Sequence, residues 1–525
     1  MAFDAIIIGS GFGGSVTACR LAEDGRRVLV LERGKRWNKD NYPRQATDQW
    51  LWDQNHPEKS PGWLDLRRFP HMTVAQGAAV GGGSHIYANV STEAPKSIFE
   101  QGWPPEIRHQ DLKPHYDSVK TMMNVKEVPQ QQWTARMKLL KEAAEKAGFG
   151  DRFRPLEIAV NFDPDWTYDK DFAKGTAATV TKLNAHGAEQ GTCVHLGNCD
   201  IGCDVHAKNT LDRNYLFVAE KQGAEVRALH LVTGIEPIAG GGYRVSFDNL
   251  EGGTRTAGSE TARMVILAAG SLGSTEMLLR CRDELKTLPL VSQRLGIGWS
   301  SNGDFLTPSL HPRRAIHPTQ GPTIAAIIDF LDGSQNGKVF WVQDGGLPNL
   351  AANFIKESAD DPSVGFKIKL TLEAMQVALR ENEPFANIMP WFSQGVDAAN
   401  GQLRLTAPKN GRTELTLDWN VQESRKVIDT IVDMHKRLAA VTEGVPLVPL
   451  TWSLFQDLIT PHPLGGCNMG TTRDTGVVDH RGEVFGYPGL YVADGAIVPE
   501  ALGVNPSRTI AALAERIASL IVAGH

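Results

Sequence analysis

The hydrophobic pattern at the start of the chain predicts two parallel strands joined by a helix. The apolar run at 3–8 is typical of a buried parallel strand. Residues 15–24 have helical composition and carry small side chains in the first turn. A second apolar run follows at 27–31 and ends on Glu32. This order of strand, helix and strand predicts a βαβ unit.

Three glycines, Gly9, Gly11 and Gly14, lie where the first predicted strand turns into the helix. Their G-x-G-x-x-G spacing, with an acidic residue about 20 positions on, fits a dinucleotide site. Gly9 would permit the tight turn, Gly11 the approach of a pyrophosphate, and Gly14 close helix packing. The helix N-terminus would supply free N–H groups, and Glu32 would accept hydrogen bonds from an adenosine ribose. A glycine-rich turn without a ligand is the alternative, and the motif does not separate FAD from NAD.

Further elements follow along the chain. Helical spacing predicts helices at 111–125, 135–147, 424–441 and 507–522. Apolar or alternating runs predict strands at 225–229, 243–247, 264–270 and 489–495, with the glycines 240–242 as the turn between the first two. The strand at 264–270 opens into a helix, which predicts a second crossing over a flat ligand. The tryptophan- and proline-rich stretch 37–70 predicts an excursion over the surface or across a cleft, without regular elements.

Both ends of the chain have the character of one nucleotide-binding domain. Its first strand lies at residue 3 and its last helix at the C-terminus, so the domain must be assembled from distant segments. This arrangement favours a large flavoprotein over a short NAD dehydrogenase. Asp494 and Gly495 end a strand and suit the far end of an extended dinucleotide. Residues 305–450 show only scattered strands, which we interpret as a second domain inserted into the first.

Composition and charge narrow the class of protein. The chain has 525 residues, 41% hydrophobic and 22% charged, which is typical of a globular protein of about two or three domains. A net charge of −6 and the lack of long basic runs argue against nucleic-acid binding. No apolar stretch reaches membrane-spanning length, and the first strand begins too early for a leader segment. We therefore expect a cytoplasmic protein with no membrane span.

Three of the six cysteines cluster at Cys193, Cys199 and Cys203. Neighbouring histidines suggest a metal site, but the spacing is not that of a zinc finger or zinc ribbon. Gly197 and Gly202 instead predict a tight loop. We expect buried thiols in a reducing compartment and no metal.

Two segments near the C-terminus carry candidate chemistry. His462 lies between two prolines and is followed by Gly465 and Gly466, so its backbone is restricted and its imidazole has open space beside it. A histidine can take a proton near neutral pH; the alternative is a loop histidine that caps a turn. Asn505 precedes Pro506 at the start of the last predicted helix. Its amide is a donor and an acceptor, and the alternative is a simple N-cap.

The order of these motifs resembles the glucose–methanol–choline (GMC) oxidoreductase family, most closely its cholesterol oxidase branch. The shared pieces are the N-terminal glycine motif, 80–84, 298–304, the His462 loop, Asp494-Gly495 and Asn505-Pro506. The resemblance covers the nucleotide-domain segments, and residues 305–450 match less well.

The resemblance implies an α/β fold (α+β overall) with a Rossmann-like FAD-binding domain assembled from distant segments. The inserted substrate-binding domain would be built on a β-sheet. We place the FAD-binding domain at 1–125, 190–305 and 455–525, and the substrate-binding domain at 126–189 and 306–454.

The resemblance also assigns residues to FAD. Gly9, Gly11 and Gly14 would contact the pyrophosphate, and Glu32 the adenosine ribose. Val232 would place its backbone at the adenine. The flavin side would be approached by Gly82, Ser84 and Asn89, the nucleotide side by Ala269 and Gly270, the ribityl chain by Asp494 and Gly495, and the pyrimidine edge by Pro506 and the last helix.

His462 and Asn505 would then form the catalytic pair of an alcohol oxidation. The implied reaction moves a hydride from the carbinol carbon to flavin N5 while the histidine takes or shares the hydroxyl proton. The expected partners are a small-molecule alcohol and O₂ or another electron acceptor. A bulky secondary alcohol such as a 3-hydroxysteroid is the first expectation; a sugar or aryl alcohol is the alternative. A hydroxynitrile lyase-like enzyme, a non-catalytic flavoprotein and an NAD-dependent dehydrogenase are more distant hypotheses.

The sequence departs from the cholesterol oxidase branch in two respects. That branch uses a further glutamate from the substrate domain, and no motif selects one here. Glu373 and Glu383 lie in the right region, and Glu500 is expected to be a surface carboxylate. His85 follows Ser84 where it could alter the flavin face, and covalent attachment through His85 is not favoured.

Overall fold

The computed structural model describes residues 1–45, 47–348, 386–407 and 413–524. The predicted βαβ unit is confirmed: β1 (Phe3–Ile8) leads through α1 (Phe12–Glu23) to β2 (Val28–Leu31), and the two strands pair in parallel. Every residue from Ala5 to Ile8 is buried, which explains why the run is apolar without alternation.

A seven-stranded sheet surrounds β1. Its order is β8-β2-β1-β11-β10-β9, and β21 also pairs with β11. The added strands are β8 (Glu225–Arg227), β9 (His230–Pro237), β10 (Tyr243–Asn249), β11 (Thr256–Leu267) and β21 (Leu490–Val492). β11 pairs in parallel with β1 and β21 and antiparallel with β10. One strand therefore holds the N-terminal and C-terminal segments in register.

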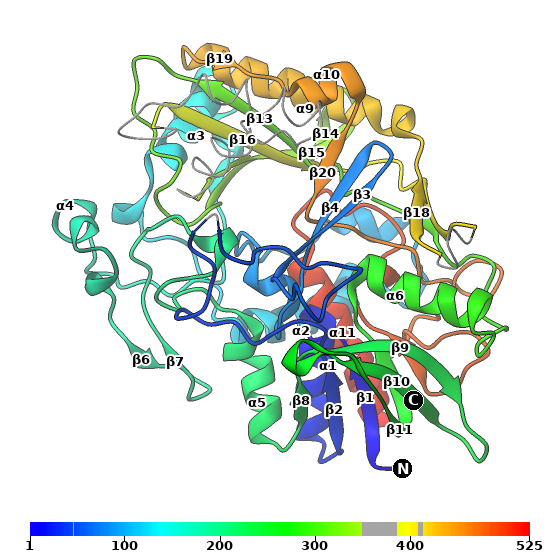
Figure 1. The fold of residues 1–525 in the computed structure, drawn as a ribbon. Coiled ribbons are helices and arrows are strands. Elements are labelled where there is room, and N and C mark those ends of the chain that lie inside the picture. The colour runs from blue at the N-terminus through cyan, green and yellow to red at the C-terminus, as the bar shows by residue number, and fades with distance from the viewer. Residues whose placement is uncertain (46, 349–385, 408–412, 525) are drawn as a thin grey trace.

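Helices from both ends of the chain pack together on this sheet (Figure 1). The C-terminal helix α11 (Ser507–Ala523) contacts α1 and α2 (His109–Met122), and α1 also contacts α5 (Tyr215–Lys221). The predicted helices at 111–125 and 507–522 are confirmed to within a few residues. The helix α6 (Gly270–Leu279) follows β11, as the strand-to-helix pattern predicted.

A second sheet lies in the upper half of Figure 1, in the order β19-β13-β16-β15-β14-β5. Its strands are β5 (Phe153–Pro155), β13 (Phe305–Leu310), β14 (Ala326–Gln335), β15 (Lys338–Asp344), β16 (Ile388–Gly395) and β19 (Val445–Pro446). α3 (Ala135–Lys146) and α9 (Val421–Val441), both predicted, pack on it. The pattern underestimated this sheet because strands such as β16 are buried along nearly their whole length and do not alternate.

Smaller elements complete the described chain. One small sheet has the order β20-β4-β3, with β3 (Leu64–Phe69), β4 (Met72–Gly77) and β20 (Leu458–Thr460), and another has the order β12-β17-β18, with β12 (Ile297–Trp299), β17 (Gly401–Leu405) and β18 (Leu415–Asp418). β6 (Lys182–Leu183), β7 (Glu189–Gln190), α4 (Tyr168–Asp171) and α10 (Leu450–Phe455) are short.

The structure corrects two predicted segments. The excursion at 37–70 is not free of regular structure, because β3 pairs with β4 at its end. The predicted hairpin of 225–229 with 243–247 is also wrong: β8 pairs with β2, and the hairpin partner of β10 is β9. The turn at 240–242 is as predicted, since all three glycines have positive φ.

The two large sheets draw on different parts of the chain. The first takes its strands from 3–31, 225–267 and 490–492, and the second from 153–155 and 305–446. The domain boundaries given above stay a prediction.

Candidate active site

The three glycines of the N-terminal motif have different surroundings. Gly9 has φ +93°, and a Cβ there would lie 2.5 Å from the Ala268 carbonyl oxygen. A Cβ on Gly14 would lie 2.0 Å from the carbonyl oxygen of Gly9. A Cβ on Gly11 would meet no atom within 4 Å. The fold itself thus requires Gly9 and Gly14, whereas Gly11 borders open space at the N-terminus of α1, where an anion is favoured.

Glu32 is buried and ties the glycine turn to the end of β2. Its Oε2 accepts hydrogen bonds from the backbone N (3.0 Å) and Oγ (2.7 Å) of Ser10, and its Oε1 from Gly34 N (2.8 Å). A carboxylate has about four lone-pair sites, so one remains for a ribose hydroxyl. Val232 is close by along the chain, because His230 N donates to the Glu32 carbonyl at the start of β9.

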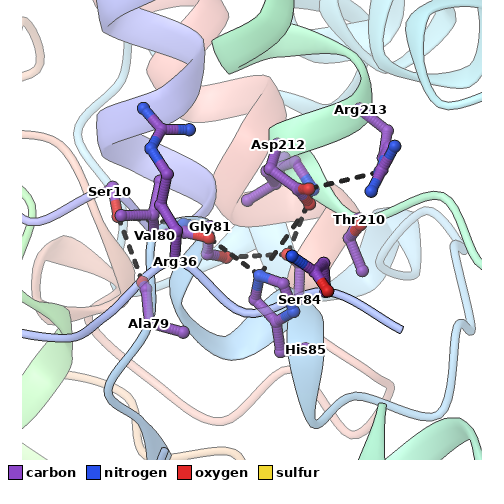
Figure 2. Close-up of polar contacts among 12 residues, drawn as sticks. Ser10, Arg36, Ala79, Val80, Gly81, Ser84, His85, Thr210, Asp212 and Arg213 are labelled. Atoms are coloured by element: carbon purple, nitrogen blue, oxygen red, sulfur yellow. Dashed lines mark hydrogen bonds and ion pairs between the residues drawn. The ribbon is translucent and has the colours of Figure 1, made fainter. Parts of the chain in front are cut away.

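A second glycine loop, the 3₁₀ turn Gly82–His85, touches the first. A Cβ on Gly82 would lie 2.6 Å from Gly11 Cα. Ser10 Oγ accepts from Gly81 N (3.0 Å) and lies 3.2 Å from Ala79 O, a contact that Figure 2 shows. Ser84 Oγ donates to Gly81 O (2.7 Å) and accepts from Leu211 N (3.1 Å). These bonds bring the two loops to one side of the open space at Gly11.

His85 is buried with both ring nitrogens already engaged. Its Nδ1 lies 2.6 Å from the Tyr42 hydroxyl and its Nε2 lies 2.8 Å from Val80 O. Figure 2 also shows Asp212 next to this ring, and its Oδ1 lies 3.8 Å from Nε2. Burial lowers the pKa of His85 despite this carboxylate. These contacts give His85 a structural role and give no support to a covalent bond to a cofactor.

Asn89 is the strongest sign that a polar ligand belongs beside these loops. It is fully buried, and neither its Oδ1 nor its Nδ2 has a partner within the protein. Its φ of +66° is a left-handed conformation that asparagine tolerates. An unpaired buried amide costs about 1–3 kcal/mol, so the site fits a ligand that offers both a donor and an acceptor, as a flavin ring edge does.

Asp494 follows the C-terminal strand and is hydrogen-bonded to the start of α6. Asp494 Oδ2 accepts from Gly270 N (2.8 Å) and Ser274 Oγ (2.5 Å), and its Oδ1 accepts from Ala496 N (2.8 Å). Ala269 caps α6, Gly495 follows Asp494, and Pro506 caps α11. Burial raises the pKa of Asp494 to about 6.

The structure places His462 and Asn505 side by side. Asn505 Nδ2 lies 3.4 Å from His462 Nε2, although the residues are 43 positions apart. The His462 loop joins the nucleotide side of the fold, because Gly465 N donates to Gly495 O (2.9 Å) and Ser271 Oγ donates to Gly465 O (2.8 Å). The imidazole is only partly exposed, with 14% of the side chain accessible.

Three further side chains complete this cluster, and none of them was assigned a role from the sequence. His462 Nδ1 lies 2.9 Å from Asp304 Oδ1 and 3.0 Å from its Oδ2. Thr460 Oγ1 donates to Asp304 Oδ2 (2.5 Å), and Gln343 Nε2 donates to Asn505 Oδ1 (2.6 Å). Burial raises the pKa of Asp304, and the nearby imidazole opposes this when it is charged.

Asp304 and Gln343 differ in how far the sequence could have identified them. Asp304 is the last residue of the 298–304 segment that carried the family resemblance. The motif therefore marked this residue, but it did not indicate a contact with His462. Gln343 lies inside β15 and carries no local signal.

Glu500 is not the surface carboxylate that we expected. It is half-buried, and its Oε1 is fully enclosed, with Trp103 as a neighbour of the carboxyl group. It packs against Gly102, where a Cβ would lie 3.3 Å from this oxygen. Burial raises the pKa of Glu500 to about 7. Glu373 and Glu383 lie outside the described residues.

The cysteine loop is tight, as predicted, with φ of +73° at Gly197 and +90° at Gly202. All six cysteines are free thiols; Cys193 is buried, and Cys199 and Cys203 are half-buried. Within the part of the chain that the structure describes, no three His, Cys, Asp or Glu side chains form a group that could hold a metal ion. Across the same residues, no helix has the length and apolar character needed to cross a bilayer.

Comparisons with known proteins show which family the chain resembles. A family described as "NAD(P)-binding Rossmann-like domain" matches residues 7–37, and one described as "GMC oxidoreductase" matches residues 397–514. A cholesterol oxidase from Acinetobacter baumannii is 31% identical over 100% of this chain and 95% of its own length. One from Mycobacterium tuberculosis is 32% identical over 99% of this chain and 91% of its own length.

Among solved structures, pyridoxine 4-oxidase from Mesorbium loti aligns with a TM-score of 0.65 at 16% identity, over 99% of both chains. At this identity the likeness concerns the fold. Together with the Rossmann-like match, it confirms the predicted α/β class.

Proposed function

The chain belongs to the GMC oxidoreductase family, in its cholesterol oxidase-like branch, and from this premise we propose that it oxidises a bulky secondary alcohol such as a 3-hydroxysteroid. Members of this family are flavoproteins, and this chain is an FAD-dependent alcohol oxidoreductase of that type. The facing pair of His462 Nε2 and Asn505 Nδ2, 3.4 Å apart, carries the proposal, because it supplies a base and an orienting donor at one point.

FAD is the cofactor that these loops fit best. Its pyrophosphate would lie in the open space at Gly11, facing the free N–H groups of α1. The unpartnered amide of Asn89 would meet a polar edge of the cofactor. We assign further contacts with the cofactor to Glu32, Gly82, Ser84, Val232, Ala269, Gly270, Asp494, Gly495 and Pro506. When bound, FAD supplies the two-electron acceptor for the hydride that leaves the carbinol carbon.

The protein's own part is to hold the hydroxyl and to move its proton. A hydroxyl within reach of both side chains would donate its O–H to His462 Nε2 and accept from Asn505 Nδ2. His462 would take the proton as the O–H bond breaks, and Asn505 would hold the oxygen in place. General base catalysis of this kind contributes about 10²- to 10⁴-fold in rate.

The substrate class is argued from relatives. Proteins named cholesterol oxidase match this chain over nearly its whole length at 31% and 32% identity, which supports a sterol-sized alcohol and O₂ as the electron acceptor. A sugar or aryl alcohol is the second candidate, because a steroid substrate is not established by relatives at 31% and 32% identity.

Anaerobic titration tests the proposal directly. The yellow holoenzyme is mixed without oxygen with a 3-hydroxysteroid, a sugar, an aryl alcohol and an aliphatic alcohol. We expect the flavin absorption to bleach with the steroid and peroxide to form when air is admitted. Bleaching with only another alcohol would redirect the substrate class. Cleavage of a cyanohydrin without bleaching, or a colourless protein that needs added NAD, would overturn the proposal.

A further inference from the structure

The cluster around His462 is a continuous chain of hydrogen bonds with two possible directions. It runs from Gln343 through Asn505 and His462 to Asp304. Each amide has one accepting and one donating end, and neutral imidazole has one nitrogen of each kind. Turning both amides over and moving the imidazole proton would satisfy the same contacts between Gln343, Asn505 and His462. These three residues therefore do not fix the direction by themselves.

Asp304 fixes the direction because an ionised carboxylate only accepts hydrogen bonds. His462 Nδ1 lies 2.9 and 3.0 Å from its two oxygens, so Nδ1 must carry the proton. Neutral His462 then has its lone pair at Nε2. Asn505 must present Nδ2 to that lone pair and Oδ1 to Gln343, and Gln343 must donate, which is the arrangement that the structure has.

Asp304 is itself held rigidly. It has 1% of its surface exposed, and Thr460 Oγ1 donates to it at 2.5 Å. Thr460 Oγ1 also accepts from His462 N (2.9 Å), so the same hydroxyl links the backbone of the imidazole to its carboxylate partner. Two carboxyl groups interact electrostatically with His462: Asp304, which directly precedes β13 of the second sheet, and Asp200 in the cysteine loop.

We propose that Asp304 is a positioning residue that commits His462 to the Nδ1–H tautomer, with Nε2 ready to accept a proton before any alcohol binds. Gln343 serves the same end by orienting the amide of Asn505. This inference rests on the proposed function for its kinetic consequence. The tautomer of His462 itself can be determined without any substrate. After proton transfer, the imidazolium would keep its Nδ1–H bond to Asp304, so no rearrangement is needed.

Asp304→Asn is the decisive variant. Asparagine has the same size, but it can present either an acceptor or a donor to Nδ1, so the direction of the chain is no longer fixed. Thr460 can accept from the new amide while it donates to Ser301 O, which lies 2.9 Å away. We expect kcat to fall about 10- to 100-fold or more, with KM and bound FAD changed less than about two-fold.

The tautomer is read by ¹⁵N NMR of histidine-labelled holoenzyme, with the His462 signals assigned from a His462→Gln sample. In the parent enzyme Nδ1 should show a pyrrole-type shift and Nε2 a pyridine-type shift. In Asp304→Asn both signals should move toward an average of the two. His435 is an internal reference, because its nitrogens contact the hydroxyls of Ser393 (2.8 Å) and Thr307 (2.9 Å) and no carboxylate.

Asp397→Asn is the matched control. Asp397 is a buried carboxylate that accepts from Ser300 Oγ (2.8 Å) and Ser301 N (2.9 Å), which belong to the same 298–304 segment as Asp304, and no hydrogen bond joins Asp397 to His462. Its replacement should lower stability and leave the His462 spectrum and kcat unchanged. A parent spectrum with the proton on Nε2, or an Asp304→Asn enzyme with unchanged tautomer and kcat, would overturn the proposal. If no alcohol is turned over, the proposed function fails while the NMR result still decides this one.

Discussion

A methyl group on Gly13 would lie 1.6 Å from the carbonyl oxygen of Ala493. The first helix and the segment after the last strand therefore meet backbone to backbone, 480 positions apart along the chain. Gly11 is only two residues away and faces open space. Two neighbouring glycines thus serve different ends, one the fold and the other the ligand.

Replacing each of these glycines with alanine should separate the role in cofactor binding from the role in folding. We expect Gly11→Ala to fold with an unchanged melting temperature as apoprotein, because its Cβ meets nothing and its φ of −70° suits alanine. Its FAD affinity should fall at least about ten-fold, since the methyl group occupies the predicted pyrophosphate space. Gly13→Ala should fail to fold or melt far lower. Thermal melts with and without FAD measure both, and normal FAD binding by Gly11→Ala would contradict the predicted cofactor position.

Removing the predicted base should stop turnover without releasing the cofactor. For His462→Gln we expect kcat to drop by about 10²- to 10⁴-fold, with the flavin absorption spectrum retained. Stopped-flow measurement of anaerobic bleaching gives the rate. His56→Gln, at a 60% exposed side chain, is the control and should behave like the parent. A His462→Gln enzyme of full activity would rule out the proposed role.

The ion pair between Arg136 and Asp344 should be critical for stability. Both side chains are completely buried, and Arg136 also donates to the carbonyls of Thr323 and Gly345. Leaving one buried charge alone costs about 3–5 kcal/mol, so Arg136→Met should lower the unfolding free energy by about that amount in urea titrations. Arg152→Met, which breaks an exposed pair with Asp332, should cost less than about 1 kcal/mol.

Glu500 should make stability depend on pH. Its pKa in the folded protein is raised from 4.5 to about 7 by burial, so its contribution is complete below pH 4.5 and is lost as the pH rises through 7. Glu500→Gln stays neutral, and we expect it to melt higher than the parent at pH 8 and equally at pH 4. The gain should be about 1 kcal/mol or less, because solvent still screens the carboxylate.

The control for this effect is Glu251→Gln, an exposed carboxylate, which should show the same melting temperature as the parent at both pH values. A Glu500→Gln protein that is stabilised equally at pH 4 and pH 8 would argue that titration of this group is not the cause.

Local patterns predicted the elements that form from neighbouring residues. The βαβ unit, the helix pair α3 and α9 and the C-terminal helix α11 all have periodicities that lie within one segment, and the structure has them within a few residues of the predicted bounds. The prediction missed β9 because it assigned 225–229 to the strand before the glycine turn. The strand that precedes this turn and pairs with β10 is β9.

The candidate site was only partly predictable for a related reason. His462 and Asn505 lie in loops whose prolines and glycines mark them locally. Asp304 lies 158 residues from His462, and Gln343 lies 162 residues from Asn505. Their importance comes from hydrogen bonds between residues that are far apart in the sequence, and the pattern within one segment does not reveal such contacts.

β11 has a consequence for the order in which the molecule is made. Its parallel partners are β1 at the beginning of the chain and β21 near the end. β10 pairs with residues 256–262 of β11, so a nascent polypeptide lacks a partner on that side only at residues 265–267, until translation reaches residue 492. A message truncated before that point would yield a product with an open strand edge, which invites aggregation and quality control.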